Sequence, residues 1–583
     1  MSEQPHRPAG ALNIPWPSIP WTGHPFLADL PVFAVGVAIL YSVVTFARYW
    51  SGPLTPQVDI DLHARALPLY ALYSMLRITT AYFLSLAFTL TYGYIAAYNR
   101  RAERFMVPLL DVLQSIPVLS FLPGVMLAMV ALFPRRQLGV ELGSILLIFT
   151  GQVWNMAFSF YSSLKSIPTE MREAAQLYRF SWWQRFTQME LPFSVIGLVW
   201  NSMMSVAGGW FFLMVCEMFV LGKRDFRLPG LGSYLQTAAE EGNTRAILYG
   251  LITMVAIVVL TDQLVWRPVV AWAQKFKFES VEAAETAQSP VLTLLRRSRL
   301  VAFIEKKSIE PVEERLALHF AKRHQAETEK VPSLQRRWSV RVIALVCLAL
   351  AVYLVFRGAM LVASLGSAEL LLILKGLGAT FLRVALALAL GSLWTVPVGV
   401  AIGTHPRLAR IAQPLAQIAA SVPATALFPI VMLALIKIGG GLGIGSIVLM
   451  LLGTQWYLLF NVIAGATAIP TELVEACTIF RFSRWERWKK LILPAIFPYL
   501  ITALVTASGG AWNASIIAEY YHLKDQVFST VGLGALISQA SDSGNFPLLF
   551  ASTIFMAATV VLINRLVWRR LYRLASTKFR LEA

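Results

Sequence analysis

Two stretches of this 583-residue chain have closely similar sequences: EAAQLYRFSWWQRFTQMELP at 173–192 and EACTIFRFSRWERWKKLILP at 475–494. The second stretch lies 302 residues after the first, and Ile-Pro-Thr-Glu precedes both. Each consists of a short polar and apolar segment, a basic and aromatic segment, and then Leu-Pro. Because proline is tolerated in the first turn of a helix, Leu-Pro predicts the start of a long helix. The pattern indicates a duplicated helical unit.

The duplication extends over most of the chain. Trp210 and Glu217 recur as Trp512 and Glu519 at the same offset of 302. Further upstream the offset is 306, and the pairs that share it are Arg77 and Arg383, Gly93 and Gly399, Pro108 and Pro414, Pro117 and Pro423, and Pro123 and Pro429. The change of four residues falls between 124 and 150, where we expect a loop, and loops tolerate insertions. The two halves therefore have the same number and direction of helices, as in parallel repeats of transporters.

The composition is that of a membrane protein. Hydrophobic residues make up 57% of the chain and charged residues 14%, whereas soluble domains contain about 25% charged residues. This excludes a cytosolic enzyme and a disordered chain. Three cysteines without a CxxC pair, Cys216, Cys347 and Cys477, indicate neither a disulfide framework nor a zinc site.

Continuous apolar runs predict twelve membrane spans, since one span needs about 20 apolar residues. The predicted spans are 29–49, 70–98, 108–133, 142–164, 192–221, 245–271, 339–362, 374–403, 413–436, 443–464, 494–519 and 546–566. The expected fold class is an all-α polytopic membrane protein with two tandem six-helix units. The expected domains are an N-terminal segment (1–28), a first unit (29–271), a charged linker (272–338) and a second unit (339–583).

The net charge of +18 has two interpretations. A nucleic-acid partner is one, and basic loops on the cytoplasmic side of a membrane are the other. The second is favoured, because the basic residues lie between apolar spans, in segments such as 99–104, 165–187 and 478–490. We therefore expect a lipid bilayer and no nucleic acid as the environment of the chain, with both termini in the cytoplasm. The Pro-rich N-terminus has no apolar core of a signal peptide.

The two repeated stretches resemble the EAA loop of type I ABC importer permeases, which in that family forms the helix that docks on a cytoplasmic ATPase. We call 166–192 the first EAA loop and 468–494 the second EAA loop. The positions that match the family's motif, or stand in its place, are Glu173, Ala174, Ala175, Arg179, Leu191, Pro192, Glu475, Ala476, Cys477, Arg481, Leu493 and Pro494. Arg179 and Arg481 stand where the family usually has glycine, which suggests a subfamily with its own ATPase.

Further motifs narrow the resemblance to nitrate, taurine and bicarbonate-type permeases. They are the proline-rich segments 115–123 and 421–429 and the glycine motifs 228–232 and 531–534. The resemblance implies two MetI-like permease units in a bacterial inner membrane and two copies of an ABC ATPase as partners. It leaves open a periplasmic solute-binding protein. The substrate class implied is a small anion such as nitrate, a sulfonate or bicarbonate, although amine and pyrimidine substrates occur among relatives.

The chain itself contains no P-loop sequence, so we expect ATP to be bound and hydrolysed by the partner subunits and the chain to hold no cofactor or metal and have no catalytic residue. Charged residues inside spans are costly and are functional candidates by default. The candidates for a substrate pathway are Arg77, Arg383, Trp210, Glu217, Trp512 and Glu519, with Trp154, Asn155, Asn201 and Asn513 as weaker ones. The alternatives are interfacial anchoring, with snorkelling arginines and belts of tryptophan, or a structural Arg–Glu pair.

Three other functions stay open at this point. An ion-coupled secondary transporter would carry charged relays near the middle of its spans, and few are present. A membrane-bound enzyme would need clusters of histidines or acids, and the chain has only seven histidines, no two of them adjacent. A scaffold that docks an ATPase without transporting anything is compatible with the sequence.

Overall fold

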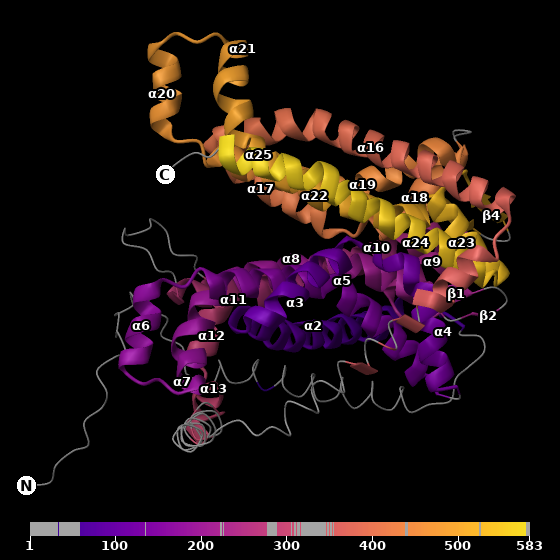
Figure 1. The fold of residues 1–583 in the computed structure, drawn as a ribbon, viewed down its shortest axis with the longest axis horizontal. Helices are drawn as coiled ribbons and strands as arrows, with labels where there is room; N and C mark the ends of the chain where they lie inside the picture. Colours follow the sequence, from indigo (N-terminus) through magenta and orange to yellow (C-terminus); the bar gives the residue numbers. More distant parts are fainter. Residues whose placement is uncertain are drawn as a thin grey trace, which may run out of the picture.

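The computed structural model describes residues 59–134, 136–221, 224–225, 227–276, 289–304, 306–307, 355–437, 441–523 and 526–578, with a few single positions elsewhere. The regular structure of this part is helical apart from two short hairpins. Figure 1 shows the helices of the first half, in indigo and magenta, side by side with those of the second half, in orange and yellow.

The first half contains one helix after another along the chain, interrupted by one hairpin. Its elements are α2 (Leu67–Tyr98), α3 (Arg100–Ser115), α4 (Leu122–Leu132), α5 (Leu138–Lys165), α6 (Thr169–Leu177), α7 (Trp182–Arg185), α8 (Leu191–Glu217), β1 (Val220–Leu221), β2 (Arg224–Asp225), α9 (Leu231–Glu240), α10 (Thr244–Thr261) and α11 (Arg267–Ala273). Two short helices of the charged linker follow, α12 (Pro290–Arg297) and α13 (Arg299–Ile304).

The second half repeats this order element by element, which confirms the duplication. Its elements are α16 (Ser367–Thr404), α17 (Pro406–Ser421), α18 (Ala424–Lys437), α19 (Leu442–Thr467), α20 (Thr471–Ile479), α21 (Arg484–Arg487), α22 (Leu493–Ala518), β3 (Tyr520–Leu523), β4 (Gln526–Ser529), α23 (Leu533–Ser543), α24 (Phe546–Ile563) and α25 (Arg569–Lys578). α2, α5 and α8 pack together in the first half, as α16, α19 and α22 do in the second.

Eight helices of the described part are long and apolar enough to cross a membrane. They are Ala64–Tyr98, Leu138–Lys165, Trp182–Glu217, Thr244–Phe276, Ser367–Thr404, Leu442–Thr467, Arg484–Ala518 and Phe546–Ala575. Each overlaps one predicted span. The predicted span 29–49 lies outside the described residues except for one position, and about half of 339–362 lies outside them. Twelve spans are therefore not confirmed.

The predicted third spans, 108–133 and 413–436, are wrong as continuous helices. α3 ends before Pro117 and α4 follows after a 3₁₀ turn, so that the two parts of the apolar segment enclose an angle of 87°. α17 likewise ends before Pro423, and α18 begins after it. Proline pushes the residue before it out of the helical region, and Ile116 and Val422 are extended, with ψ of 126° and 116°.

The predicted spans 192–221 and 494–519 extend slightly beyond the observed helices. α8 ends at Glu217, and the chain then forms the antiparallel hairpin of β1 and β2. The hairpin is closed by a hydrogen bond from the Leu228 amide to the Glu217 carbonyl, at 3.0 Å. The Thr530 amide donates in the same way to the carbonyl of Glu519 in the second half, also at 3.0 Å. Both hairpins were missed because strands of two to four residues leave little periodic signal.

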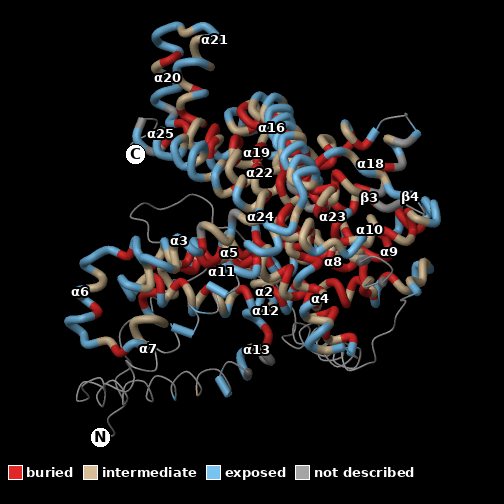
Figure 2. The backbone as a smooth tube through the Cα atoms, turned by 45° about the vertical axis from the view of Figure 1, so that its right-hand side comes forward, coloured by how far each residue is buried: buried red, intermediate tan, exposed pale blue. Residues whose placement is uncertain are grey.

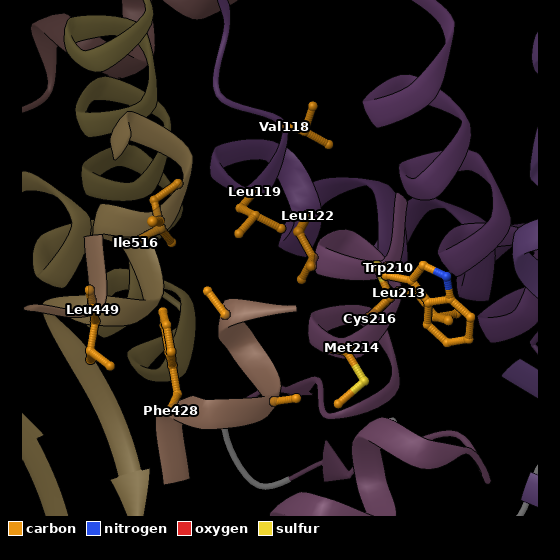
Figure 3. Packing of buried hydrophobic residues seen from close by; sticks show 14 of the residues in the cluster. Val118, Leu119, Leu122, Trp210, Leu213, Met214, Cys216, Phe428, Leu449 and Ile516 are labelled. Carbon is orange, nitrogen blue, oxygen red and sulfur yellow. The ribbon is translucent and has the colours of Figure 1, made fainter. Parts of the chain in front are cut away.

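The two halves meet through exchanged contacts. α24 of the second half packs on α3 of the first, α10 of the first half packs on α17 of the second, and α18 packs on both α8 and α9. Figure 3 shows Leu119 and Leu122 of the first half facing Ile516, Leu449 and Phe428 of the second. One buried hydrophobic cluster thus runs through both halves. Lipid tails are as apolar as these side chains, so in a bilayer the cluster joins the halves through close van der Waals packing and not through removal of apolar surface from water.

Polar contacts fix the register of this interface. The Tyr521 hydroxyl donates to Gln236 Oε1 at 2.8 Å, and the Thr553 hydroxyl donates to the carbonyl of Ser120 at 3.1 Å. Burial raises the pKa of Tyr521, so its hydroxyl stays protonated and remains a donor. Asn513 Oδ1 accepts from the Leu119 amide at 3.4 Å.

A buried ion pair ties α2 to the end of α8 in the first half. Arg77 Nη1 donates to Glu217 Oε1 at 2.8 Å and to the Pro229 carbonyl at 2.8 Å. The same guanidinium is bidentate to Glu141, at 2.6 and 2.7 Å. All three charged side chains have no exposed surface.

The second half has an equivalent ion pair with only one carboxylate. Arg383 Nη1 donates to Glu519 Oε1 at 2.9 Å and to the Val531 carbonyl at 2.7 Å. At the offset of 302, Glu141 corresponds to Gly443, and Thr530 supplies the remaining acceptor, at 2.9 Å. Arg383 is 14% exposed, whereas Arg77 is fully enclosed.

The glycine motifs at 228–232 and 531–534 provide space for these carboxylates. The amides of Gly232 and Gly534 donate to Glu217 and Glu519, at 2.8 and 2.9 Å. A Cβ on Gly230 would lie 2.3 Å from the carboxyl carbon of Glu217, and one on Gly532 would lie 2.1 Å from Glu519 Oε2. Only glycine lets the backbone approach so closely.

We predict that Arg77→Met lowers the free energy of unfolding by about 3–5 kcal/mol, because it leaves two buried carboxylates without a cation. Arg383→Met is the matched control and should cost less, since it strands one carboxylate beside a partly exposed site. Thermal unfolding of the purified full chain in detergent, followed by circular dichroism, measures the difference. Equal unfolding temperatures for Arg77→Met and the wild type would contradict this role.

Candidate functional site

The two EAA loops project from the same end of the molecule, beyond α5 and α19. Figure 2 colours α6, α20 and α21 mostly as exposed, in contrast to the buried centres of the long helices. In the first loop, α6 starts directly after Pro168 and α7 continues through a π-helical turn, Phe186–Glu190, into α8. The second loop repeats this with the π-helical turn Trp488–Ile492. The second helix of each loop is therefore continuous with the following span.

The turn between the two helices of each loop is the same. The Phe180 amide donates to the Ala175 carbonyl at 2.9 Å, and the Arg179 amide donates to the Gln176 carbonyl at 3.0 Å. This pair of bonds is the Schellman motif, whose central residue is left-handed and usually glycine. Arg179 and Arg481 occupy that position with φ of 50° and 51°. The arginines thus keep the glycine-type turn, at a cost of about 1–2 kcal/mol each.

A capping box starts the second helix of each loop, which the sequence reasoning missed. The Ser181 hydroxyl accepts from the Gln184 amide at 3.3 Å, and Gln184 Oε1 accepts from the Ser181 amide at 2.9 Å. Ser483 and Glu486 form the same pair, at 3.3 and 3.0 Å. The spacing Ser-x-x-Gln/Glu before an apolar run is the signal that could have found it.

The residues of the EAA motif divide into exposed and buried ones. Glu173, Ala174 and Glu475 are exposed, and Ala476 is half-buried. Ala175 and Cys477 are buried, and Ala175 packs into a cluster with Ile167 and Met189. The Leu-Pro positions lie at the base of the loops, where Leu191, Pro192 and Pro494 are half-buried and Leu493 is exposed. Each loop therefore presents a carboxylate on one face of its first helix and anchors the loop with the opposite face.

The two loops are anchored differently. In the first, Arg185 Nε lies 2.7 Å from Glu190 Oε1, and the Tyr98 hydroxyl donates to the same oxygen at 2.5 Å. At the offset of 302, Glu190 corresponds to Ile492, which packs with Val462 and Ile496 in an apolar cluster. A polar network thus holds the first loop to α2, and an apolar cluster holds the second.

The candidates for the substrate pathway take structural positions in this conformation. Arg77 pairs with Glu217 and Arg383 with Glu519, as in the alternative of a structural Arg–Glu pair. Trp210 and Trp512 are 2% and 1% exposed and belong to the shared hydrophobic cluster. A pathway role for these six residues stays a prediction.

A polar cavity that is open toward the surface lies elsewhere in the first half. It has a volume of about 320 Å³ and is lined by Gln114, Asn155, Phe158, Ser159 and Asn201. Asn155 and Asn201, two of the weaker sequence candidates, are thus brought together from α5 and α8, whereas Trp154 and Asn513 do not line it. Gln114 and Ser159 carry no signal that would have singled them out.

No metal site competes with this assignment within the part of the chain that the structure describes. There, no three His, Cys, Asp or Glu side chains lie close enough to hold a metal ion. Cys216 and Cys477 are buried free thiols.

Comparison with known proteins agrees with the duplicated architecture. The nitrate import permease protein NrtB of Leptolyngbya laminosa is 26% identical to this chain over 33% of the chain and 65% of its own length. The bicarbonate transport system permease protein CmpB of Synechocystis sp. is 26% identical over 31% of this chain and 62% of its own length. The taurine transport system permease protein TauC of Escherichia coli is 28% identical over 28% of this chain and 57% of its own length. The chain thus spans less than two thirds of each of these relatives.

The family model of the binding-protein-dependent transport system inner membrane component matches twice, at residues 89–265 and 395–580. Each match contains one EAA loop and the long helices on either side of it. Together the matches cover more than half of the chain, in two copies. The chain therefore belongs to the binding-protein-dependent transport system inner membrane component family, as a multi-pass inner membrane protein with two such units.

Proposed function

We propose that this chain supplies both membrane halves of one ATP-driven importer and docks two cytoplasmic ATPase subunits, one on each EAA loop. The observation that carries the proposal is the matching geometry of the two loops. Both have the same turn and capping box, and both expose a carboxylate, Glu173 or Glu475, at the same end of the molecule. A pair of identical ATPase subunits fits a pair of equivalent docking helices.

The end that carries the EAA loops is then the cytoplasmic end, and both termini of the chain lie there. Basic residues at this end support the orientation. They include Arg100, Arg101, Arg172, Arg484 and Lys489. A periplasmic solute-binding protein would deliver substrate at the opposite end, near α9, α23 and the two hairpins.

The arrangement of the halves suggests how ATP binding drives transport. Their ribbons lie together near α9, α10, α23 and α24 and separate toward the end with α6 and α20 (Figure 1). Drawing the two ATPase subunits together would move the EAA loops toward each other, with the contacts of α24 on α3 and α10 on α17 as the pivot. The continuous helices from α7 into α8 and from α21 into α22 would transmit this movement into the spans.

We further propose that the polar cavity of the first half forms part of the pathway wall. Asn155 lies ten residues before the end of α5 and Asn201 ten residues after the start of α8, which places both about 15 Å from the cytoplasmic ends of these helices. That depth is near the middle of a bilayer core of about 30 Å, where transporters place substrate sites. The amide and hydroxyl groups can hydrogen-bond a small solute, and the relatives named for nitrate, bicarbonate and taurine point to a small anion.

Glu173→Lys together with Glu475→Lys should abolish ATP-driven uptake and co-purification of the ATPase, because each docking helix then carries the opposite charge. The unfolding temperature of the chain should stay at the wild-type value, since both side chains are exposed. Glu241→Lys, which changes an exposed carboxylate at the opposite end, is the control and should leave co-purification intact. Uptake and assembly at wild-type levels in the double variant would contradict docking at these loops.

Asn155→Ala and Asn201→Ala should each lower uptake about fivefold below saturation, the effect expected for one lost hydrogen bond of about 1 kcal/mol. Uptake of nitrate, bicarbonate and taurine into vesicles that contain the assembled importer measures this. Thr91→Ala is the control, because Thr91 is exposed on α2 and its hydroxyl bonds its own helix. Unchanged uptake of the transported solute in both asparagine variants would remove the cavity from the pathway.

A further inference from the structure

The two EAA loops share a strained arginine that the fold does not need. Arg179 and Arg481 are the only residues other than glycine with positive φ in the described part of the chain. A left-handed conformation is unfavourable for a residue with a Cβ, and glycine would form the same turn without strain. Because this unfavourable residue occurs at two equivalent positions, we infer that the arginine side chain has a function there.

The surroundings of both arginines are those of a contact surface. Leu177 and Tyr178 beside Arg179 are 81% and 74% exposed, and Ile479 and Phe480 beside Arg481 are 77% and 73% exposed. Large apolar side chains around an arginine are typical of the centre of a protein interface. Within the described part of the chain, neither guanidinium makes an ion pair or a side-chain hydrogen bond, and both arginines are exposed. Both guanidinium groups are therefore accessible to a partner.

We propose that each of these arginines forms a bidentate ion pair with a carboxylate in the docking cleft of one ATPase subunit, and that this pair selects the chain's own ATPase. The inference rests on the proposed docking of ATPase subunits at the EAA loops. A guanidinium matches a carboxylate through two parallel hydrogen bonds, which fixes orientation as well as charge. Two equivalent arginines meet two copies of one subunit, so a single acidic site on the ATPase serves both loops.

Anionic lipid is a less fitting partner for these side chains. Attraction to a charged lipid surface depends on the number of cations and not on one position. The second loop already offers Arg484, Lys489 and Lys490 at exposed, unstrained helical positions. A strained turn residue would add little to such an attraction, whereas a single carboxylate in a cleft requires a cation at one place.

The test compares three variants of the full chain in nanodiscs of zwitterionic lipid, with the ATPase subunit purified from its complex with this chain as the probe. Arg179→Gly with Arg481→Gly keeps the turn and removes both guanidinium groups. Arg179→Lys with Arg481→Lys keeps the charge and loses the fork. Arg104→Gln with Arg410→Gln is the matched control, because these exposed, equivalent arginines lie near the same end and the change removes the same two charges.

The glycine variant should bind the ATPase about 10-fold to 100-fold more weakly than the wild type at about 50 mM salt. The difference should shrink at about 300 mM salt, where exposed charges are screened. The lysine variant should fall between the two, and the control should bind as the wild type does. The unfolding temperature of the glycine variant should equal or exceed the wild-type value, since the strain is relieved.

Three results would overturn the inference. One is wild-type affinity and salt dependence in the glycine variant, and another is an equal loss in the control, which would mean diffuse charge attraction. The third is a difference that appears only in nanodiscs rich in phosphatidylglycerol, which would assign the arginines to lipid. If Glu173→Lys with Glu475→Lys abolishes binding while the glycine variant binds normally, docking stands and only this inference fails. If no ATPase subunit co-purifies with the wild-type chain, the proposed function fails with it.

Discussion

The buried carboxylate at the end of α8, Glu217, and its counterpart Glu519 at the end of α22 organise the outer part of each half. Each carboxylate accepts from an arginine of α2 or α16, from a hydroxyl on that same helix, and from a glycine amide after the hairpin. A buried charge without such partners would be strongly destabilising. Folding must therefore bring together the end of α8 or α22, the loop after the hairpin, and the start of α9 or α23. This requirement explains why the glycine motifs recur at the same offset as the acids.

The two halves have the same order of helices and strands but differ in the side chains at several equivalent positions. Arg77 faces two carboxylates, whereas Arg383 faces one, because Gly443 takes the place of Glu141. The first EAA loop is tied to α2 through Glu190, and the second is held by apolar packing around Ile492. The polar cavity has no equivalent lining in the second half, where Tyr457 and Ala503 replace Asn155 and Asn201. Fusion of two units into one chain allows each half to change separately while the turn and the capping box of the EAA loops stay alike.

Continuity of the helices gives the EAA loops mechanical contact with the membrane part. Proline in a helix removes a hydrogen bond, and a π-helical turn of five residues precedes Leu-Pro in both halves. The lost hydrogen bond is thus accommodated within the π-helical turn, and the helix continues into α8 or α22. By contrast, Pro117 and Pro423 are each preceded by an extended residue, and the helix is interrupted there. Those interrupted segments lie where the two halves exchange contacts, next to the shared hydrophobic cluster.

The sequence by itself determined the duplication, eight helices long and apolar enough to cross a membrane, and the two EAA loops, because these depend on apolar runs and on motifs within about twenty residues. It also identified Arg77 and Glu217 as exceptional, since a charge in an apolar span is conspicuous. Only the tertiary structure decided that these two, 140 residues apart, bind each other, and that Asn155 and Asn201 line one cavity. It also decided that the third predicted spans break at proline and that Arg179 and Arg481 are left-handed. The physical reason is that the sequence shows which buried charge needs a partner and which segment forms a turn. The identity of the partner and the conformation of the turn residue depend on how distant segments pack together.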